Sequence, residues 1–152
     1  MTGVPAPLMV RPFEAADRAA LIELWRRCEL TRPWNDPDRD IDRKLDRDGE
    51  LLLVGLIDDE LVASVMAGYD GHRGWVNYLA VDPNARGARH GAAIMYAAED
   101  RLRALGCPKI NLQIRTSNVD AVRFYESIGY SMDDVVSMGR RLIDDTTDDD
   151  VT

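Results

Sequence analysis

The spacing of apolar residues along this chain predicts four helices and six strands. Four stretches show helical spacing, and three of them end at a glycine, a residue that commonly follows a helix C-terminus. Alternating or continuously apolar runs bounded by turn residues indicate the strands. In chain order, we expect a strand at 8–13, a helix reaching Cys28, a helix ending near Gly49, strands at 51–57, 61–68 and 75–81, a helix at 91–105, a strand at 109–115, a helix at 118–128 and a strand at 130–138.

This order predicts an α/β fold with a mixed sheet. Three consecutive strands joined by short turns should pair antiparallel. A helix separates the strand at 75–81 from the strand at 109–115, and such a connection makes two strands of one sheet parallel. The expected architecture is therefore β-α-α-β-β-β-α-β-α-β, a central mixed sheet flanked by helices.

The expected domain covers residues 8–143. Residues 1–7 contain two prolines and a glycine, which favours a loose lead-in. Residues 144–152 contain five aspartates and no basic residue, so we expect an acidic, disordered tail.

Composition and charge agree with one folded domain and exclude several functions. A length of 152 residues with 45% apolar side chains suits a single core. The formal net charge is −8, but without the last nine residues the chain carries 22 acidic and 19 basic side chains. Neither value gives the basic surface that nucleic acid requires, so no nucleic-acid partner is expected.

The sequence indicates neither a membrane protein nor an exported one. No apolar run approaches the roughly 20 residues of a membrane span, and no export signal begins the chain. We therefore expect the cytoplasm and no membrane partner. Cys28 and Cys107 are too few for a disulfide framework or a zinc site and should be free thiols. No grouping of His, Asp, Glu or Cys has metal-ligand spacing, so no metal is expected.

A candidate anion site lies in the connection between the strand at 75–81 and the helix at 91–105. The first turn of a helix has unpaired N–H groups and partial positive charge, which attract phosphate oxygens. Gly87 and Gly91 permit close approach of a ligand, and Arg86 and Arg89 add charge-assisted donors. The alternative is an ordinary turn with solvated arginines. The spacing matches neither a Walker loop nor a dinucleotide fingerprint.

Two motifs in this sequence resemble the GNAT superfamily of N-acetyltransferases. The loop Arg86-Gly87-Ala88-Arg89-His90-Gly91 resembles its acetyl-coenzyme A loop, written R/Q-x-x-G-x-G/A, and residues 118–130 are similar to its second signature. The stretches at 32–37, 68–74 and 106–110 are similar to a bacterial subgroup called YpeA-like. One departure is Arg89, which occupies the place of the motif's central glycine. A side chain there is costly if that position needs a positive φ.

The resemblance implies an acetyl-CoA-dependent N-acetyltransferase that acts on a primary amine by direct transfer in a ternary complex. In that superfamily the pantetheine arm of the coenzyme pairs with the exposed edge of a splayed central strand. The implied coenzyme-binding residues are Leu79, Val81, Arg86, Gly87, Ala88, Arg89, His90, Gly91, Ala92 and Asn118. The Val81 N–H is the hypothetical donor to the developing oxyanion. Members of the superfamily often pair, so a homodimer is a candidate state.

Tyr125 is the catalytic residue that the resemblance implies. The superfamily places a tyrosine at this motif position beside the coenzyme sulfur, where a phenol can protonate the departing thiolate. The alternative is a core tyrosine. Against that alternative, Ala121, Phe124 and Ile128 already form the apolar stripe of this helix, and Tyr125 falls at its edge.

The sequence leaves the general base and the acceptor open. Asp70 and His72 lie in the turn that enters the central strand, and histidine suits proton uptake near neutrality. Trp34 and Asp36 lie in the loop between the first two helices and could receive a cationic amine. The alternatives are an exposed histidine, a tryptophan at the core edge and an aspartate that caps a helix. A metabolite, an antibiotic, a peptide N-terminus and a protein lysine all remain candidate acceptors.

Two other functions compete with catalysis. The first is a catalytically weak acyl-CoA-binding or regulatory module of the same fold, because Arg89 departs from the motif and no base is evident. The second is a nucleotide-binding protein with an ordinary phosphate loop, although the loop lacks a Ser or Thr to hold magnesium.

Overall fold

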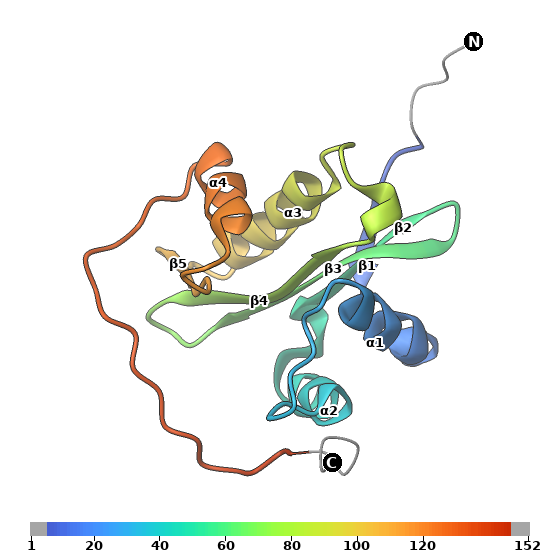
Figure 1. Ribbon diagram of the computed structural model, residues 1–152. Coiled ribbons are helices and arrows are strands. Elements are labelled where there is room, and N and C mark those ends of the chain that lie inside the picture. Colours follow the sequence, from blue (N-terminus) through green and yellow to red (C-terminus); the bar gives the residue numbers. More distant parts are fainter. Residues whose placement is uncertain (1–5, 147–152) are drawn as a thin grey trace.

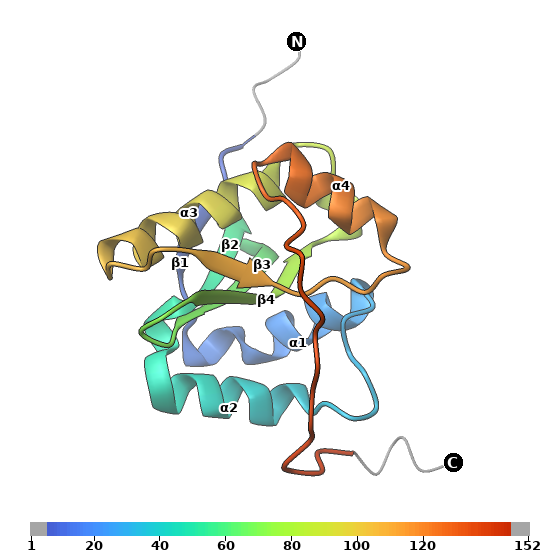
Figure 2. The ribbon, with the colours of Figure 1, turned by 90° about the vertical axis from the view of Figure 1, so that its left-hand side faces the viewer.

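The computed structural model describes residues 6–146, which form one mixed α/β domain around a five-stranded sheet (Figure 1). Helices α1 and α2 cover one face of the sheet, and α3 and α4 cover the other (Figure 2). The strands are β1 (Met9–Pro12), β2 (Leu52–Ile57), β3 (Glu60–Tyr69), β4 (Gly74–Val81) and β5 (Ile110–Leu112). The helices are α1 (Arg18–Arg27), α2 (Pro37–Asp48), α3 (His90–Ala104) and α4 (Val119–Ser127), with 3-10 turns η1 (Ala15–Asp17), η2 (Gly49–Leu51) and η3 (Pro83–Ala85).

The strands follow chain order across the sheet, from β1 to β5. Neighbours from β1 to β4 pair antiparallel, whereas β4 and β5 pair parallel. The parallel pair arises because α3 carries the chain back along the sheet before β5 begins. The mixed sheet and its parallel pair, both predicted from the element order, are confirmed.

Each face of the sheet has its own apolar core. Leu53, Val65 and Ile94 belong to the core beneath α3, while Trp25 and Leu52 belong to the core beneath α1 and α2. Strand β2 is buried over most of its length on both faces. This two-sided burial explains why β2 reads as a continuous apolar run and not as an alternating one.

The short β4–β5 pair leaves part of β4 with an open edge. Backbone pairing between these strands begins at Gly74 and ends where Val76 faces Leu112, whereas β4 continues to Val81. The open stretch begins beside a bulge, because Tyr78 has a φ of +52° and the register with β3 shifts there. A bulge bends its strand locally. The parallel strands therefore meet at one end only, and residues 77–81 of β4 have no strand neighbour on that side.

The sixth strand expected at 130–138 is wrong. Residues 131–143, which we call the C-terminal arm, run extended from the end of α4 past β5 towards α2 without joining the sheet (Figure 2). Lys109 Nζ lies 2.6 Å from Asp133 Oδ2, and Gln113 Nε2 donates to Ser137 Oγ. These contacts are made by side chains, which keep the two backbones farther apart than the roughly 4.8 Å of paired strands. Strand β5, at three residues, also offers a very short edge for pairing.

Asp145, which lies inside the expected acidic tail, makes contacts with α2. Its carboxylate accepts from Arg43 at 2.6 and 2.9 Å and from Arg39 at 3.2 Å, and the residue is only 4% exposed. The partners lie about a hundred positions earlier in the chain, so the local sequence gives no sign of this contact. The remainder of that tail, 147–152, and positions 1–5 of the expected lead-in lie outside the described residues.

Candidate functional site

The predicted residues Leu79 and Val81 lie on the open edge of β4. The Asp82 N–H donates to Val62 O on β3 at 2.7 Å. Because N–H directions alternate along a strand, the Val81 N–H points away from β3, towards the open edge. The Val81 carbonyl accepts from Cys28 Sγ at 3.2 Å and from Arg86 Nε at 3.3 Å. An extended ligand would therefore meet an available amide at position 81.

The loop that follows β4 exposes a run of backbone amides at the start of α3. Gly87 has a φ of +92° and Arg89 a φ of +62°, and these two turns bring the chain into the helix. Among residues 6–146, no backbone or side-chain oxygen accepts a hydrogen bond from the amides of residues 87–92. These amides stand at the positive end of a 15-residue helix, an arrangement that fits phosphate oxygens.

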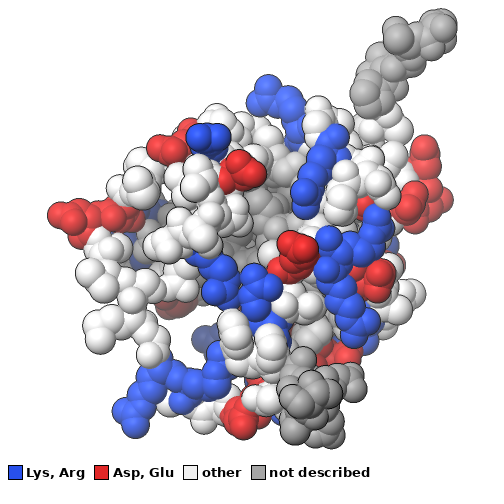
Figure 3. All heavy atoms as spheres, in the orientation of Figure 1, with Lys and Arg blue, Asp and Glu red and all other residues white. Residues whose placement is uncertain are grey.

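The face between α3 and α4 is hollowed, and basic side chains lie along its rim (Figure 3). Gly91 has a packing role in this region. A Cβ at Gly91 would lie 3.1 and 3.2 Å from two ring carbons of Phe124, so α4 rests directly on the first turn of α3. His90, expected in the loop, is instead the first residue of α3 and is buried, as is Ala92.

Tyr125 lies on α4, next to Phe124, at the edge of the core beneath α3. Its ring makes edge-on contacts with Phe124 and Tyr130, at centroid distances of 5.1 and 5.7 Å. Burial raises the pKa of Tyr125 to about 12, because an apolar environment disfavours the phenolate. The phenol therefore stays protonated at neutral pH. Asn118 caps this helix by accepting from the Ala121 N–H at 3.1 Å.

One ion pair that sequence reasoning missed fixes the end of β4. Arg27 on α1 donates to both carboxylate oxygens of Asp82, at 2.7 and 2.8 Å, and Asp82 is buried. Asp82 also accepts from the Asn84 N–H at 2.9 Å, which starts the turn η3. The two residues are 55 positions apart, so only the tertiary structure reveals their contact. This pair joins the start of the loop after β4 to α1 on the opposite face of the sheet.

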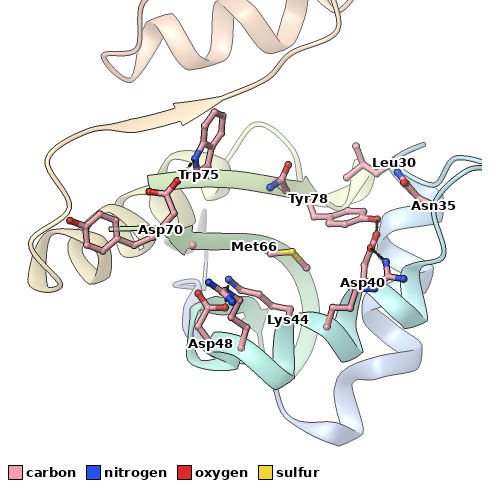
Figure 4. Close-up of a pocket in the computed structure, with 14 residues that line it drawn as sticks. Leu30, Asn35, Asp40, Lys44, Asp48, Met66, Asp70, Trp75 and Tyr78 are labelled. Atoms are coloured by element: carbon pink, nitrogen blue, oxygen red, sulfur yellow. Dashed lines mark hydrogen bonds and ion pairs between the residues drawn. The ribbon is translucent and has the colours of Figure 1, made fainter. Parts of the chain in front are cut away.

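A cavity of about 610 Å³ lies on that opposite face, between α2 and strands β3 and β4 (Figure 4). Trp75 and Asp70 line one end, and Tyr78 and Asp40 line the other. The cavity combines aromatic rings with charged groups of both signs, and Met66 lies between its two ends. Such a mixture suits a polar ligand with a cationic part.

Of the four residues predicted as general base or as contacts of the acceptor, only Asp70 lines this cavity. Asp70 lines the cavity, but its carboxylate accepts from the amides of His72 and Arg73, and these bonds lower its pKa. Asp36 accepts from the amides of Asp38 and Arg39, which makes it the N-cap of α2.

The other two predicted residues, Trp34 and His72, lie in exposed surroundings. Trp34 is 41% exposed, and the guanidinium carbon of Arg115 lies 5.7 Å from the centre of its ring. A cationic side chain of the protein therefore already lies over the ring where a substrate amine was considered. His72 is exposed at the hairpin tip and does not line the cavity.

The cavity contains an acid that sequence reasoning missed. Asp40 accepts from the Tyr78 hydroxyl at 2.6 Å, and burial raises the pKa of Asp40 above its ordinary value. The ring of Tyr78 stacks on Trp25 at a centroid distance of 3.8 Å. A sequence signal existed, because charged residues recur every three or four positions along one side of α2. Such a pattern is typical of a solvated helix face, whereas Asp40 forms part of a cavity wall.

Solved structures share this fold. The chain matches Ard1 from Thermoplasma volcanium with a TM-score of 0.75 at 22% identity, over 83% of this chain and 84% of that one. It matches an aminoglycoside N-acetyltransferase in complex with CoA with a TM-score of 0.73 at 14% identity, over 93% and 99% of the two chains.

The sequence comparisons identify the family, whereas the structural comparisons show a shared fold. The model of the acetyltransferase (GNAT) family matches residues 18–130. A protein named as an acetyltransferase from Pectobacterium atrosepticum is 47% identical over 136 residues, which are 90% of this chain and 96% of that protein. The chain belongs to the acetyltransferase (GNAT) family, as its two motifs predicted. The assignment to the YpeA-like subgroup stays a prediction.

Residues 6–146 contain neither a membrane-spanning helix nor a metal-binding cluster. No helix in this part of the chain is long and apolar enough to cross a membrane. The same part contains no cluster of three or more His, Cys, Asp or Glu side chains arranged to hold a metal ion.

Proposed function

We propose that this protein is an acetyl-CoA-dependent N-acetyltransferase that acetylates a primary amine by direct transfer in a ternary complex. The observation that carries the proposal is the convergence, in a chain of this family, of an open strand edge and unsatisfied loop amides at the end of β4. Acetyl-CoA would supply an acetyl group already activated as a thioester. The chain then has to bind and orient the two substrates and to transfer the protons that the reaction moves.

The residues around the end of β4 fit the parts of acetyl-CoA. The amides of residues 87–92 would hold the diphosphate, with the guanidinium groups of Arg86 and Arg89 beside them. Backbone groups of Leu79 and Val81 would pair with the extended pantetheine arm, as an added strand does. Asn118 would contribute by fixing the start of α4, which carries Tyr125.

Tyr125 would act as the proton donor to the sulfur of the bound coenzyme. A phenol that burial keeps protonated can donate from its Oη at neutral pH. A thiolate in the same dry surroundings would also be a stronger base than in water, which helps the transfer. The Val81 N–H, directed to the open edge, would stabilise negative charge that develops on the acetyl oxygen. No covalent acetyl-enzyme is needed, and burial raises the pKa of Cys28, which keeps it a thiol.

The acceptor amine would enter through the cavity between α2 and β4. Asp40 is a better candidate than Asp70 to take up the proton of the amine, because burial raises the pKa of Asp40 whereas turn amides lower that of Asp70. The acceptor would be a primary amine that is small or linear enough for its amino group to enter this cavity of about 610 Å³.

The proposal is tested by calorimetric titration with acetyl-CoA, followed by release of free coenzyme A across a panel of amines. We expect binding, and thiol release that depends on the amine. Binding without thiol release for any amine would support the alternative, a regulatory module that holds acyl-CoA. A preference for ATP over acetyl-CoA in competition would instead support a nucleotide-binding protein.

The Tyr125→Phe variant tests the proton donor. We expect kcat to fall about 100-fold, because the phenol proton is needed only during transfer, while the Kd of acetyl-CoA stays nearly unchanged. Tyr96→Phe is the matched control, since Tyr96 lies on α3 with its side chain partly in solvent. Full turnover in Tyr125→Phe would remove Tyr125 from the mechanism and leave the fold assignment intact.

A further inference from the structure

The bulge at Tyr78 reverses the direction in which the backbone amides of β4 point. The Gly74 N–H donates at 2.8 Å to the carbonyl of the residue before β5, whereas the Asp82 N–H donates at 2.7 Å to Val62 O, on the β3 side. These two amides are separated by an even number of positions, so in a regular strand they would point to the same side. The Val81 N–H therefore points to the open edge because the bulge precedes it.

The same bulge decides which side chains of β4 line the cavity beside α2. Between the paired positions Asn77 and Ala80, β4 has two residues where β3 has one. As a result, Asn77 and Tyr78 line the cavity in succession, and Leu79 packs against the core beneath α3. Without the extra residue, the side chain of Tyr78 would point to the α3 face, away from Asp40.

The bulge places Tyr78 in a backbone conformation that side chains disfavour. Its φ of +52° lies in the left-handed region, which glycine adopts freely and tyrosine does not. Such a conformation persists only where surrounding contacts hold it. The stacking of the Tyr78 ring on Trp25 acts on the side chain, so the backbone needs a contact of its own.

Ser64 on β3 supplies that contact. Its hydroxyl donates to the Tyr78 carbonyl at 2.8 Å and accepts from Trp25 Nε1 at 2.9 Å, and the residue is 0% exposed. Because an indole N–H can only donate, it directs the hydroxyl proton of Ser64 to the carbonyl. Removing the hydroxyl would leave both partners unpaired away from water, which is costly.

These contacts form one connected cluster that ends at Asp40 on α2. Trp25 comes from α1, Ser64 from β3 and Tyr78 from β4. The Tyr78 ring stacks on Trp25 at 3.8 Å, and the Tyr78 hydroxyl donates to Asp40 at 2.6 Å (Figure 4). Ser64 itself does not line the cavity, so any effect it has on the site passes through Tyr78.

We propose that Ser64 is a positioning residue for acetyl transfer, because its hydroxyl holds the β4 bulge in place. The bulge in turn directs the Val81 N–H to the open edge and the Tyr78 hydroxyl to Asp40. This inference rests on the proposed function, and it adds a buried residue that touches neither substrate.

Hydrogen exchange in the free protein tests whether Ser64 holds the bulge. In the unmodified chain the Asp82 amide should exchange slowly, because it is hydrogen-bonded, and the Val81 amide rapidly. Ser64→Ala should speed exchange roughly tenfold more at Asp82 than at Leu53, in the middle of the sheet. Val54→Ala is the matched control, because it weakens the same core without removing the bridge, and it should leave Asp82 no more affected than Leu53. Equal acceleration at the two amides in Ser64→Ala would overturn the inference.

Titration with acetyl-CoA tests the consequence for the site. In Ser64→Ala, the Kd of acetyl-CoA should rise and kcat should fall, each roughly tenfold, because the β4 edge and Tyr78 are no longer held. In Val54→Ala, both constants should stay within about twofold of the unmodified values, since the bulge keeps its bridge. No binding of acetyl-CoA by the unmodified chain would overturn the proposed function. Binding and turnover that Ser64→Ala leaves unchanged would overturn this inference alone.

Discussion

Arg89 shows how a single residue departs from the pattern of its family and still takes the required backbone conformation. The motif places a glycine here, and Arg89 adopts the left-handed conformation that a glycine would take freely. For other residues this conformation costs about 1–2 kcal/mol. If an anion binds at the unsatisfied amides of the loop, the guanidinium group of Arg89 would add a charged donor there, which is a physical reason to accept that strain.

The variant Arg89→Gly should distinguish the effect of backbone strain on stability from the effect of the side chain on acetyl-CoA affinity. We expect the free energy of unfolding to rise by up to about 1 kcal/mol, because the relief of strain exceeds the entropy that glycine adds to the unfolded chain. The affinity for acetyl-CoA should fall, since a charged donor is lost. Urea unfolding and calorimetry measure the two effects. Arg86→Gly is the control, because Arg86 has a φ of −72° and no strain to release. A lower stability in Arg89→Gly would contradict the argument.

At the scale of elements, the site depends on how α4 lies against α3. Gly91 lets the ring of Phe124 rest on the first turn of α3, and Tyr125 follows on the same helix. The apolar stripe of α4 was readable in the sequence, but the glycine was first interpreted as a point of approach for a ligand. The packing partner of a glycine is a tertiary fact, because nothing in its own residue type specifies what lies opposite.

Gly91→Ala should push α4 away from α3. The new Cβ would lie 3.1 Å from the Phe124 ring, so we expect a loss of about 1–2 kcal/mol in the free energy of unfolding. Weaker binding of acetyl-CoA should accompany it. Adding Phe124→Leu, which shortens the opposing side chain, should recover part of both losses. Urea unfolding with calorimetry provides the check, and an unchanged midpoint in Gly91→Ala would show that the helices adjust without cost.

At the scale of the whole molecule, Asp145 connects the end of the C-terminal arm to α2. Its two arginine partners lower the pKa of Asp145 from an ordinary value of 3.8 to about 2. A carboxylate with a lowered pKa adds stability that is complete above its unfolded value and disappears as the pH falls through its folded value. The contact should therefore hold above about pH 4 and be lost progressively towards pH 2.

Asp145→Asn should flatten this part of the pH profile. Between pH 5 and pH 3, the urea midpoint of the unmodified protein should fall more steeply than that of the variant, since the variant has no ion pair left to lose. Asp46→Asn is the control, because Asp46 is an exposed aspartate of α2 without an ion pair to another described residue. Identical slopes in the unmodified protein and Asp145→Asn would show that the contact adds no stability.

The sequence alone determined those features that depend on neighbouring residues. Apolar spacing set the four helices and five of the six expected strands, and the two motifs located the loop after β4 and the helix that carries Tyr125. The helix cap at Asp36 was an alternative that the sequence offered, because a cap acts on amides two or three positions away.

Only the tertiary structure decided the features that join distant parts of the chain. The open edge of β4, the Arg27–Asp82 pair and the cavity wall with Asp40 require elements that the sequence separates by tens of residues. The sixth strand failed for the same reason. A strand exists only when another backbone lies beside it, and an apolar extended segment cannot specify which backbone that will be.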